Sequence, residues 1–145
     1  MIEKIFYKKK LYALIVKGSY RKKKGINFFT PPYTTQQFAY LNHKKNHVIK
    51  PHKHKKRLTK IMSTTEVVLI LKGILRVDFY TLNKKYLFSK ILRKNDIILL
   101  VHGAHGFKVI KNVQMLEVKQ GPYSDSKDKI KFENIDDKKI RFKKK

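Results

Sequence analysis

The sequence predicts an all-β domain, built as a sandwich or a barrel of antiparallel strands. Short apolar runs recur with turn-forming residues about every ten positions, and this spacing is typical of such folds. No stretch carries a long, clean apolar period of 3.6 residues, so helices are not expected to build the core. Gly and Pro number only ten of the 145 residues, which excludes fibrous and linker-like chains.

The first part of the chain is predicted to open with a β-hairpin. The runs Ile2–Tyr7 and Leu11–Val16 flank three consecutive lysines and are expected to pair with each other. A basic loop follows over 17–25, and Pro31 and Pro32 end any ladder that reaches them. Two further strands are expected over 36–41 and 47–54, around a turn at 42–46, before a second basic loop over 55–63.

The second part of the chain is predicted to supply most of the sheet. Its apolar runs are 64–71, 74–80, 86–92, 97–101, 106–110 and 114–119. The segments between them contain good turn formers, which are Gly73, Asn83, Asn95, Gly103 and Asn112. We therefore assign residues 1–123 to a single domain that includes the N-terminal hairpin, and residues 124–145 to a charged C-terminal tail.

The composition excludes several classes of protein. The absence of cysteine rules out disulfides, thiolate zinc sites, iron–sulfur clusters and a cysteine nucleophile. The longest apolar runs, 11–16 and 97–101, are far below the roughly 18–20 residues that a membrane-spanning helix needs. The first of them is also too short for the core of a signal peptide. We therefore expect a cytoplasmic protein with no membrane partner.

The formal charge of +26 is the most unusual property of the chain, since 36 Lys and Arg face 10 Asp and Glu. Such a field attracts nucleic acid and other polyanions. However, only five of the basic residues are Arg, the side chain suited to reading phosphate. The charge is also dispersed, with +8 over 1–24, +8 over 42–60, +6 over 61–123 and +4 over 124–145. We expect no specific nucleic-acid partner, and a basic nucleic-acid-associated protein stays the less favoured alternative.

Four histidines and one glutamate form the most informative pattern. His52 and His54 are two residues apart on a predicted strand, so both side chains point to one face, where they can reach one metal ion. Glu66 begins the most apolar region, where a buried carboxylate needs a partner. His102 and His105 follow the run 97–101 and lie on either side of the glycine at 103.

This layout resembles the cupin superfamily. The first cupin motif has the form HxH, a gap, Glu, six residues and Gly, and here it corresponds to His52, His54, Glu66 and Gly73. The second motif corresponds to residues 95–105, which run Asn-Asp, an apolar strand, and then His-Gly-Ala-His. The gap from His54 to Glu66 holds eleven residues, longer than in the motif, and one residue rather than two separates Gly103 from His105. The likeness extends over residues 25–132 and is nearest to small, uncharacterised bacterial cupins met among surface-polysaccharide and sugar-nucleotide genes.

The resemblance implies a double-stranded β-helix, or jelly-roll barrel, with a divalent metal in its pocket. His52, His54, Glu66 and His105 would be the metal ligands, with His102 as the alternative to His105. Iron, manganese, nickel and zinc all suit such a set. The implied function is to bind or convert a small molecule, in particular an anionic carbohydrate or sugar-nucleotide derivative, by isomerisation or epimerisation. A ligand-sensing cupin without catalysis stays open as the alternative.

Further residues are predicted around this pocket. Glu117 alternates with the apolar positions of its run and is the candidate general base, with a strand-lysine partner as the alternative. Gln37 and Tyr40 are expected at the mouth of the pocket as substrate-binding residues. The N-terminal hairpin is expected to pair with a second subunit, so we predict a homodimer.

Overall fold

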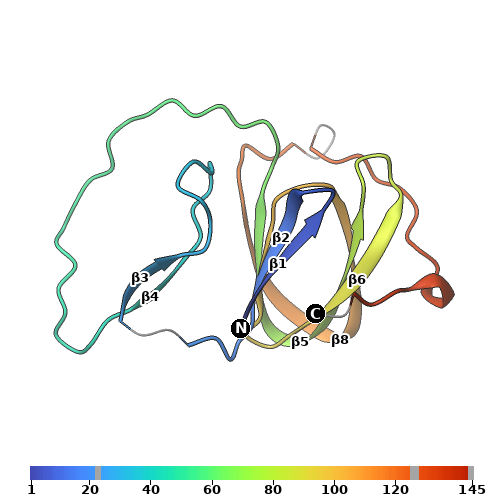
Figure 1. Ribbon diagram of the computed structural model, residues 1–145, viewed down its shortest axis with the longest axis horizontal. Helices are drawn as coiled ribbons and strands as arrows, with labels where there is room; N and C mark the ends of the chain where they lie inside the picture. The colour runs from blue at the N-terminus through green and yellow to red at the C-terminus, as the bar shows by residue number, and fades with distance from the viewer. Residues whose placement is uncertain (22–23, 125–127, 144–145) are drawn as a thin grey trace. The chain divides into compact units, whose positions relative to one another are not determined.

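The computed structural model describes residues 1–21, 24–124 and 128–143 and is all-β (Figure 1). The strands are β1 (Ile2–Tyr7), β2 (Lys10–Val16), β3 (Gly25–Phe28), β4 (Ala39–Asn42), β5 (Glu66–Tyr80), β6 (Tyr86–Arg93), β7 (Ile97–Leu100) and β8 (Ala104–Lys119). One 3₁₀ turn, η1, covers Asp137–Lys139. The chain forms two compact units: unit 1 comprises Met1–Tyr20 and Thr64–Lys145, and unit 2 comprises Arg21–Ser63.

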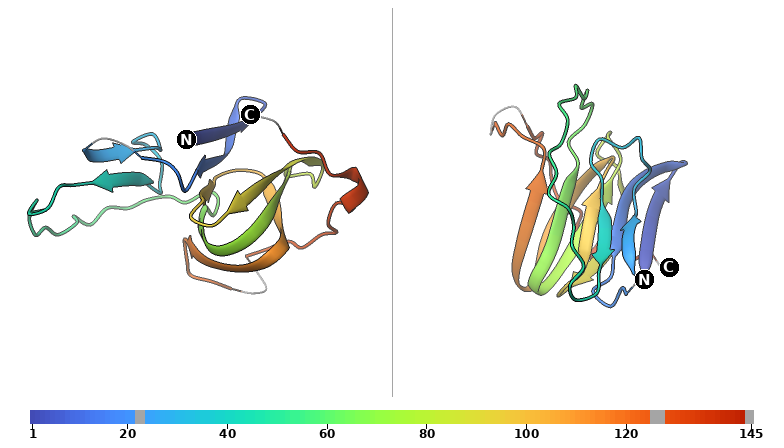
Figure 2. Two further views of the ribbon diagram at one scale, coloured as in Figure 1. Left: turned by 90° about the horizontal axis from the view of Figure 1, so that it is seen from below. Right: turned by 90° about the vertical axis from the view of Figure 1, so that its left-hand side faces the viewer.

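Unit 1 is a curled antiparallel sheet in the form of a half-barrel. Its strand order is β1-β2-β7-β5-β6, and β8 pairs with the opposite edge of β5. Along its first edge β5 pairs with β7 over 66–69 and with β6 over 74–80. Along its second edge β5 pairs with β8 from end to end. Figure 2 shows β5 and β8 as long, strongly curved ribbons that follow the same arc.

The predicted N-terminal hairpin is confirmed. Lys8 and Lys9 both have positive φ, 46° and 62°, and Tyr7 pairs with Lys10 across them. A two-residue turn with both φ values positive matches the right-handed twist of the flanking strands. β2 then pairs with β7, and the core cluster of unit 1 includes Ala13 and Ile15 of β2 and Ile98 and Leu100 of β7.

The tail closes one edge of this sheet. The main chain of Ser89 in β6 donates to the carbonyl of Arg141 at 2.8 Å and accepts from the amide of Lys143 at 3.4 Å. On the other side, Nζ of Lys143 donates to the carbonyl of Phe6 in β1 at 3.3 Å. Lys90 of β6 also forms an ion pair with Glu3 of β1. Residues 141–143 therefore bridge β6 and β1.

Two pairs of strands that the sequence separates are continuous in the structure. The runs 64–71 and 74–80 form the single strand β5, and the runs 106–110 and 114–119 form β8. Gly73 adopts φ +87°, and the pairing register between β5 and β8 shifts on both sides of it. This glycine therefore bends the two-stranded ribbon instead of reversing the chain. Such irregularities increase local bending and twist. They allow a 15-residue strand to curl around the core.

The predicted strand over 47–54 is wrong. Residues 47–60 have no assigned secondary structure, and all residues from 44 to 64 are exposed. The segment contains Pro51 and five Lys or Arg between 53 and 60, so it has no apolar face to bury. The paired strands of unit 2 are β3 and β4, which form an antiparallel hairpin. The sequence pattern did not predict the strand over 25–28. Next to this hairpin, Phe29 stacks edge-on against Phe38, with ring centroids 5.2 Å apart.

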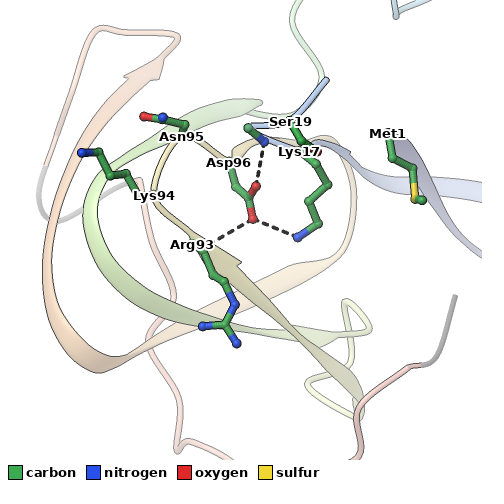
Figure 3. A pocket seen from close by; sticks show the side chains of 8 residues that line it. Met1, Lys17, Ser19, Arg93, Lys94, Asn95 and Asp96 are labelled. Atoms are coloured by element: carbon green, nitrogen blue, oxygen red, sulfur yellow. Dashed lines mark hydrogen bonds and ion pairs between the residues drawn. The ribbon is translucent and has the colours of Figure 1, made fainter. Parts of the chain in front are cut away.

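A hollow of about 430 Å³ lies where the end of β2 meets the turn between β6 and β7. Figure 3 shows Asp96 near its centre, facing Lys17. The Asp96 carboxylate accepts from Lys17 Nζ at 2.8 Å, from the amide of Gly18 at 2.9 Å and from the amide of Arg93 at 3.0 Å. These contacts hold the turn against β2, so Asp96 has a structural role here.

Candidate functional site

A cavity of about 580 Å³ lies in unit 1 and is lined by both ends of the curled β5, by the start of β8 and by the tail. Glu66 and Tyr80, the first and last residues of β5, both line it. Both residues line one cavity because β5 curls. The left view of Figure 2 shows this curl. From the tail, residues 128–132 and Asn134 complete the wall.

Two ionisable side chains from different strands come into contact at this cavity. Glu66 pairs with Leu100, the last residue of β7, and a short turn then leads to His105 in β8. Gly103 makes this turn with φ +80°, and a Cβ there would lie 2.3 Å from the ring of Tyr12. The tight turn places Nε2 of His105 3.0 Å from Oε2 of Glu66.

The environment of Glu66 is unusual for a carboxylate. Its side chain is 8% exposed, whereas that of His105 is 27% exposed. The contact with His105 lies within ion-pair distance but is not aligned as a hydrogen bond, and no described residue donates a directed hydrogen bond to Oε2. The neighbouring imidazole of His105 is the main cause of the lowered pKa of Glu66. Burial acts in the opposite direction and raises this pKa, whereas the positive charges of Lys129 and Lys119 lower it further. Glu66 is therefore a carboxylate at neutral pH.

The rest of the cavity is cationic and aromatic. Lys84, Lys129 and Lys131 line it, and none of them has a carboxylate within ion-pair distance among the described residues. The second acid at the cavity, Asp128, lies 3.9 Å from Nζ of Lys119. These lysines give the cavity a positive field that favours an anionic ligand.

The tail is attached to this cavity through aromatic contacts and one hydrogen bond. The ring of Phe132 packs edge-on against Tyr80, with centroids 5.1 Å apart, and Nζ of Lys84 lies 5.8 Å from the Phe132 ring. The amide of Ile135 donates to the hydroxyl of Tyr80 at 3.1 Å. The tail thus supplies Lys129, Lys131 and Phe132 to the site, and the sequence reasoning did not place any of them there. The only local signal was the apolar pair Ile130 and Phe132 in a charged segment.

The structure brings together two of the four predicted metal ligands. Glu66 and His105 meet in unit 1, whereas His52 and His54 belong to the exposed segment of unit 2, with ring centroids 5.3 Å apart. Over residues 1–21, 24–124 and 128–143, no three His, Asp or Glu side chains gather as a metal-binding group. Unit 1 by itself therefore does not supply the ligand set that the resemblance implies, and the metal stays a prediction.

Gln37 and Tyr40 belong to unit 2, and Glu117 and His102 do not line the cavity of unit 1. Gln37 binds within its own loop in unit 2, where its amide donates to the carbonyl of Pro31 at 2.9 Å. Tyr40 lies in β4 opposite Asn27. Glu117 is exposed on β8 and does not line the cavity. His102 packs edge-on against Tyr12, with centroids 5.2 Å apart, and burial lowers its pKa.

Comparison with known proteins adds no assignment. No protein-family model, no curated protein and no solved structure matches this chain. Among the described residues, no helix has the length and apolar character needed to cross a bilayer.

The lowered pKa of Glu66 predicts a pH-dependent contribution to stability. A carboxyl whose pKa is lower in the folded protein stabilises it above the unfolded pKa, about 4.3 for glutamate, and loses this effect as the pH falls through the folded value. We therefore expect Glu66→Gln to lower the free energy of unfolding at pH 7, and the difference from the wild type to shrink below about pH 4. Urea titrations from pH 7 to pH 3 measure this. The control Glu133→Gln removes an exposed tail carboxylate and is expected to give only a small difference.

Proposed function

We propose that unit 1 binds a small anionic carbohydrate derivative and that the Glu66–His105 pair transfers a proton on it. The observation that carries this proposal is the buried Glu66 carboxylate, which lines the cavity, has His105 3.0 Å away and receives no directed hydrogen bond on Oε2 from any residue that the structure describes. A buried carboxylate costs free energy unless it has partners, so a site that keeps one without full pairing favours a functional role. The jelly-roll barrel of the cupins remains the proposed fold family.

The proposed chemistry is isomerisation or epimerisation next to a carbonyl group. Glu66, ionised at neutral pH, accepts the proton from the carbon beside the carbonyl, and the C–H electron pair forms an enolate. In isomerisation, the imidazolium form of His105 protonates the enolate oxygen, Glu66 returns its proton to the former carbonyl carbon, and His105 recovers a proton from the neighbouring hydroxyl group. In epimerisation, His105 instead delivers its proton to the opposite face of the same carbon, and the pair then exchanges protons with the solvent. The reaction is redox-neutral overall, so it needs no oxidant or reductant.

The lysines of the cavity determine the preferred class of substrate. Lys84, Lys129 and Lys131 attract a phosphate or carboxylate group, and Phe132 and Tyr80 offer aromatic surface to a sugar ring or a base. A phosphorylated sugar or a sugar nucleotide carries both features, whereas a neutral hexose carries only one.

Isotope exchange tests this proposal. The protein is incubated in D₂O with hexose phosphates, sugar nucleotides and neutral hexoses, and NMR measures binding and deuterium uptake beside the carbonyl. We expect binding of the anionic sugars only, and a drop in exchange of about 10²-fold or more in Glu66→Gln, since one acid–base group contributes 10²–10⁴-fold. Glu133→Gln is the matched control. Unchanged exchange in Glu66→Gln would contradict the catalytic role, and binding without exchange in the wild type would replace it with the ligand-sensing alternative.

A further inference from the structure

We infer that the free edge of β8 is the site where two copies of this chain pair to form a dimer. The inference is independent of the proposed function of the cavity. It moves the expected subunit contact from the N-terminal hairpin to the opposite end of the sheet.

The outer edge of β8 is long and open. β8 spans 16 residues and, among the described residues, pairs with β5 alone. Figure 2 (right) shows it at the outer side of the row of strands of unit 1, with β5 as its neighbour. Unpaired N–H and C=O groups on such an edge are a template for another strand, and proteins normally block or pair them. Here residues 141–143 cover the edge of β6, whereas no described residue pairs its main chain with the outer edge of β8.

The face beside this edge is apolar. Leu116 and Val118 of β8 are 57% and 60% exposed, and they pair with Leu69 and Val67 of β5 on the same face of the sheet. Leu71 is also exposed, at 40%. A contiguous exposed apolar patch of this kind marks an interaction site in a protein that is otherwise strongly charged.

The charge pattern along the edge selects a second copy as its partner. The chain carries +26, so two copies repel each other over most of their surfaces. Residues 112–118 contain no Lys or Arg and one acid, Glu117, so this edge adds no positive charge of its own to the contact.

The sequence of β8 over 113–119 also complements itself. A two-fold axis through Leu116 places each even-numbered residue opposite an even-numbered residue of the second copy, and each odd-numbered residue opposite an odd-numbered one. Antiparallel hydrogen bonding between identical strands requires this arrangement. Leu116 then faces Leu116 of the second copy, and Val118 faces Gln114. Lys119 lies opposite Val113, so no two basic side chains are directly opposed. The apolar patches of the two copies become one continuous face.

Cysteine cross-linking tests this register, because the chain has no cysteine of its own. Directly paired residues of antiparallel strands have Cα atoms about 4.5–5.5 Å apart, a distance that a disulfide spans. We expect Leu116→Cys to form a disulfide-linked dimer under mild oxidation, and the exposed Val48→Cys of unit 2 to stay mostly monomeric. Equal cross-linking of the two variants would overturn the proposed register.

Sedimentation measures the dimer without a cross-link. We expect the full-length wild type to reach a monomer–dimer equilibrium that shifts towards dimer as NaCl rises from 0.05 to 0.5 M, because salt screens the repulsion. Leu116→Lys is expected to weaken the dimer about tenfold or more, and Val48→Lys to leave it unchanged. A wild type that stays monomeric at every salt concentration, or that forms open-ended aggregates, would overturn the proposal, since a two-fold contact closes at two copies.

Discussion

Replacing Gly73 by alanine is expected to destabilise unit 1 by about 2–5 kcal/mol. About 1–2 kcal/mol arises because φ at this position is +87°, a region that L-residues other than glycine adopt at a cost. A further 1–3 kcal/mol, roughly, arises from overpacking. An added Cβ would lie 2.0 Å from the carbonyl oxygen of Asn112 and 2.3 Å from that of Lys111, and both are main-chain atoms that no rotamer change can move. The ribbon of β5 and β8 must then open at its bend.

Urea unfolding followed by far-UV circular dichroism measures this loss. The matched control is Gly25→Ala, where φ is +95° but no atom lies within 4 Å of the added Cβ. The control is expected to show the backbone cost alone, about 1–2 kcal/mol. If both substitutions cost the same, the close approach of the β8 main chain at Gly73 does not limit stability.

Replacing Asp78 by alanine is expected to have an effect of similar size. Asp78 is 2% exposed and binds the guanidinium of Arg76 through both carboxylate oxygens, at 2.8 and 3.0 Å. It also accepts from the hydroxyl of Ser89 at 2.5 Å. Arg76 is itself 5% exposed, so removing Asp78 leaves a buried cation with one remaining carboxylate partner among the described residues, Asp137, at 2.8 Å. Breaking a buried ion pair in this way costs about 3–5 kcal/mol.

The same guanidinium provides the control. Asp137→Ala removes the other carboxylate that binds Arg76, but this carboxylate is 54% exposed and water can replace it. We expect a much smaller change in the urea midpoint for Asp137→Ala than for Asp78→Ala. Comparable losses of stability in the two variants would show that burial does not determine how strongly each carboxylate stabilises Arg76.

The candidate site was predictable in part. The residue types and the resemblance singled out Glu66 and His105, and the structure brings the two together. The lysines and the aromatic ring that the tail contributes were not predictable. Lys129, Lys131 and Phe132 follow Glu66 by more than sixty residues, and nothing in their local sequence distinguishes them from a solvated tail. Their position depends on contacts such as that between Phe132 and Tyr80, which exist only after β5 has curled.

The sequence by itself determined the all-β class and the strands with a clear apolar pattern, including the N-terminal hairpin, β6 and β7. These elements follow from local properties, since apolar spacing and turn residues act over a few positions. Where the local pattern allowed two different structures, only the tertiary structure decided between them. A glycine such as Gly73 serves a tight turn or a bulge equally well, and only the pairing of β5 with β8 on both sides of it selects the bulge. Conversely, the strand expected over 47–54 does not form, because a strand forms only where a neighbouring strand and a buried face are available to it.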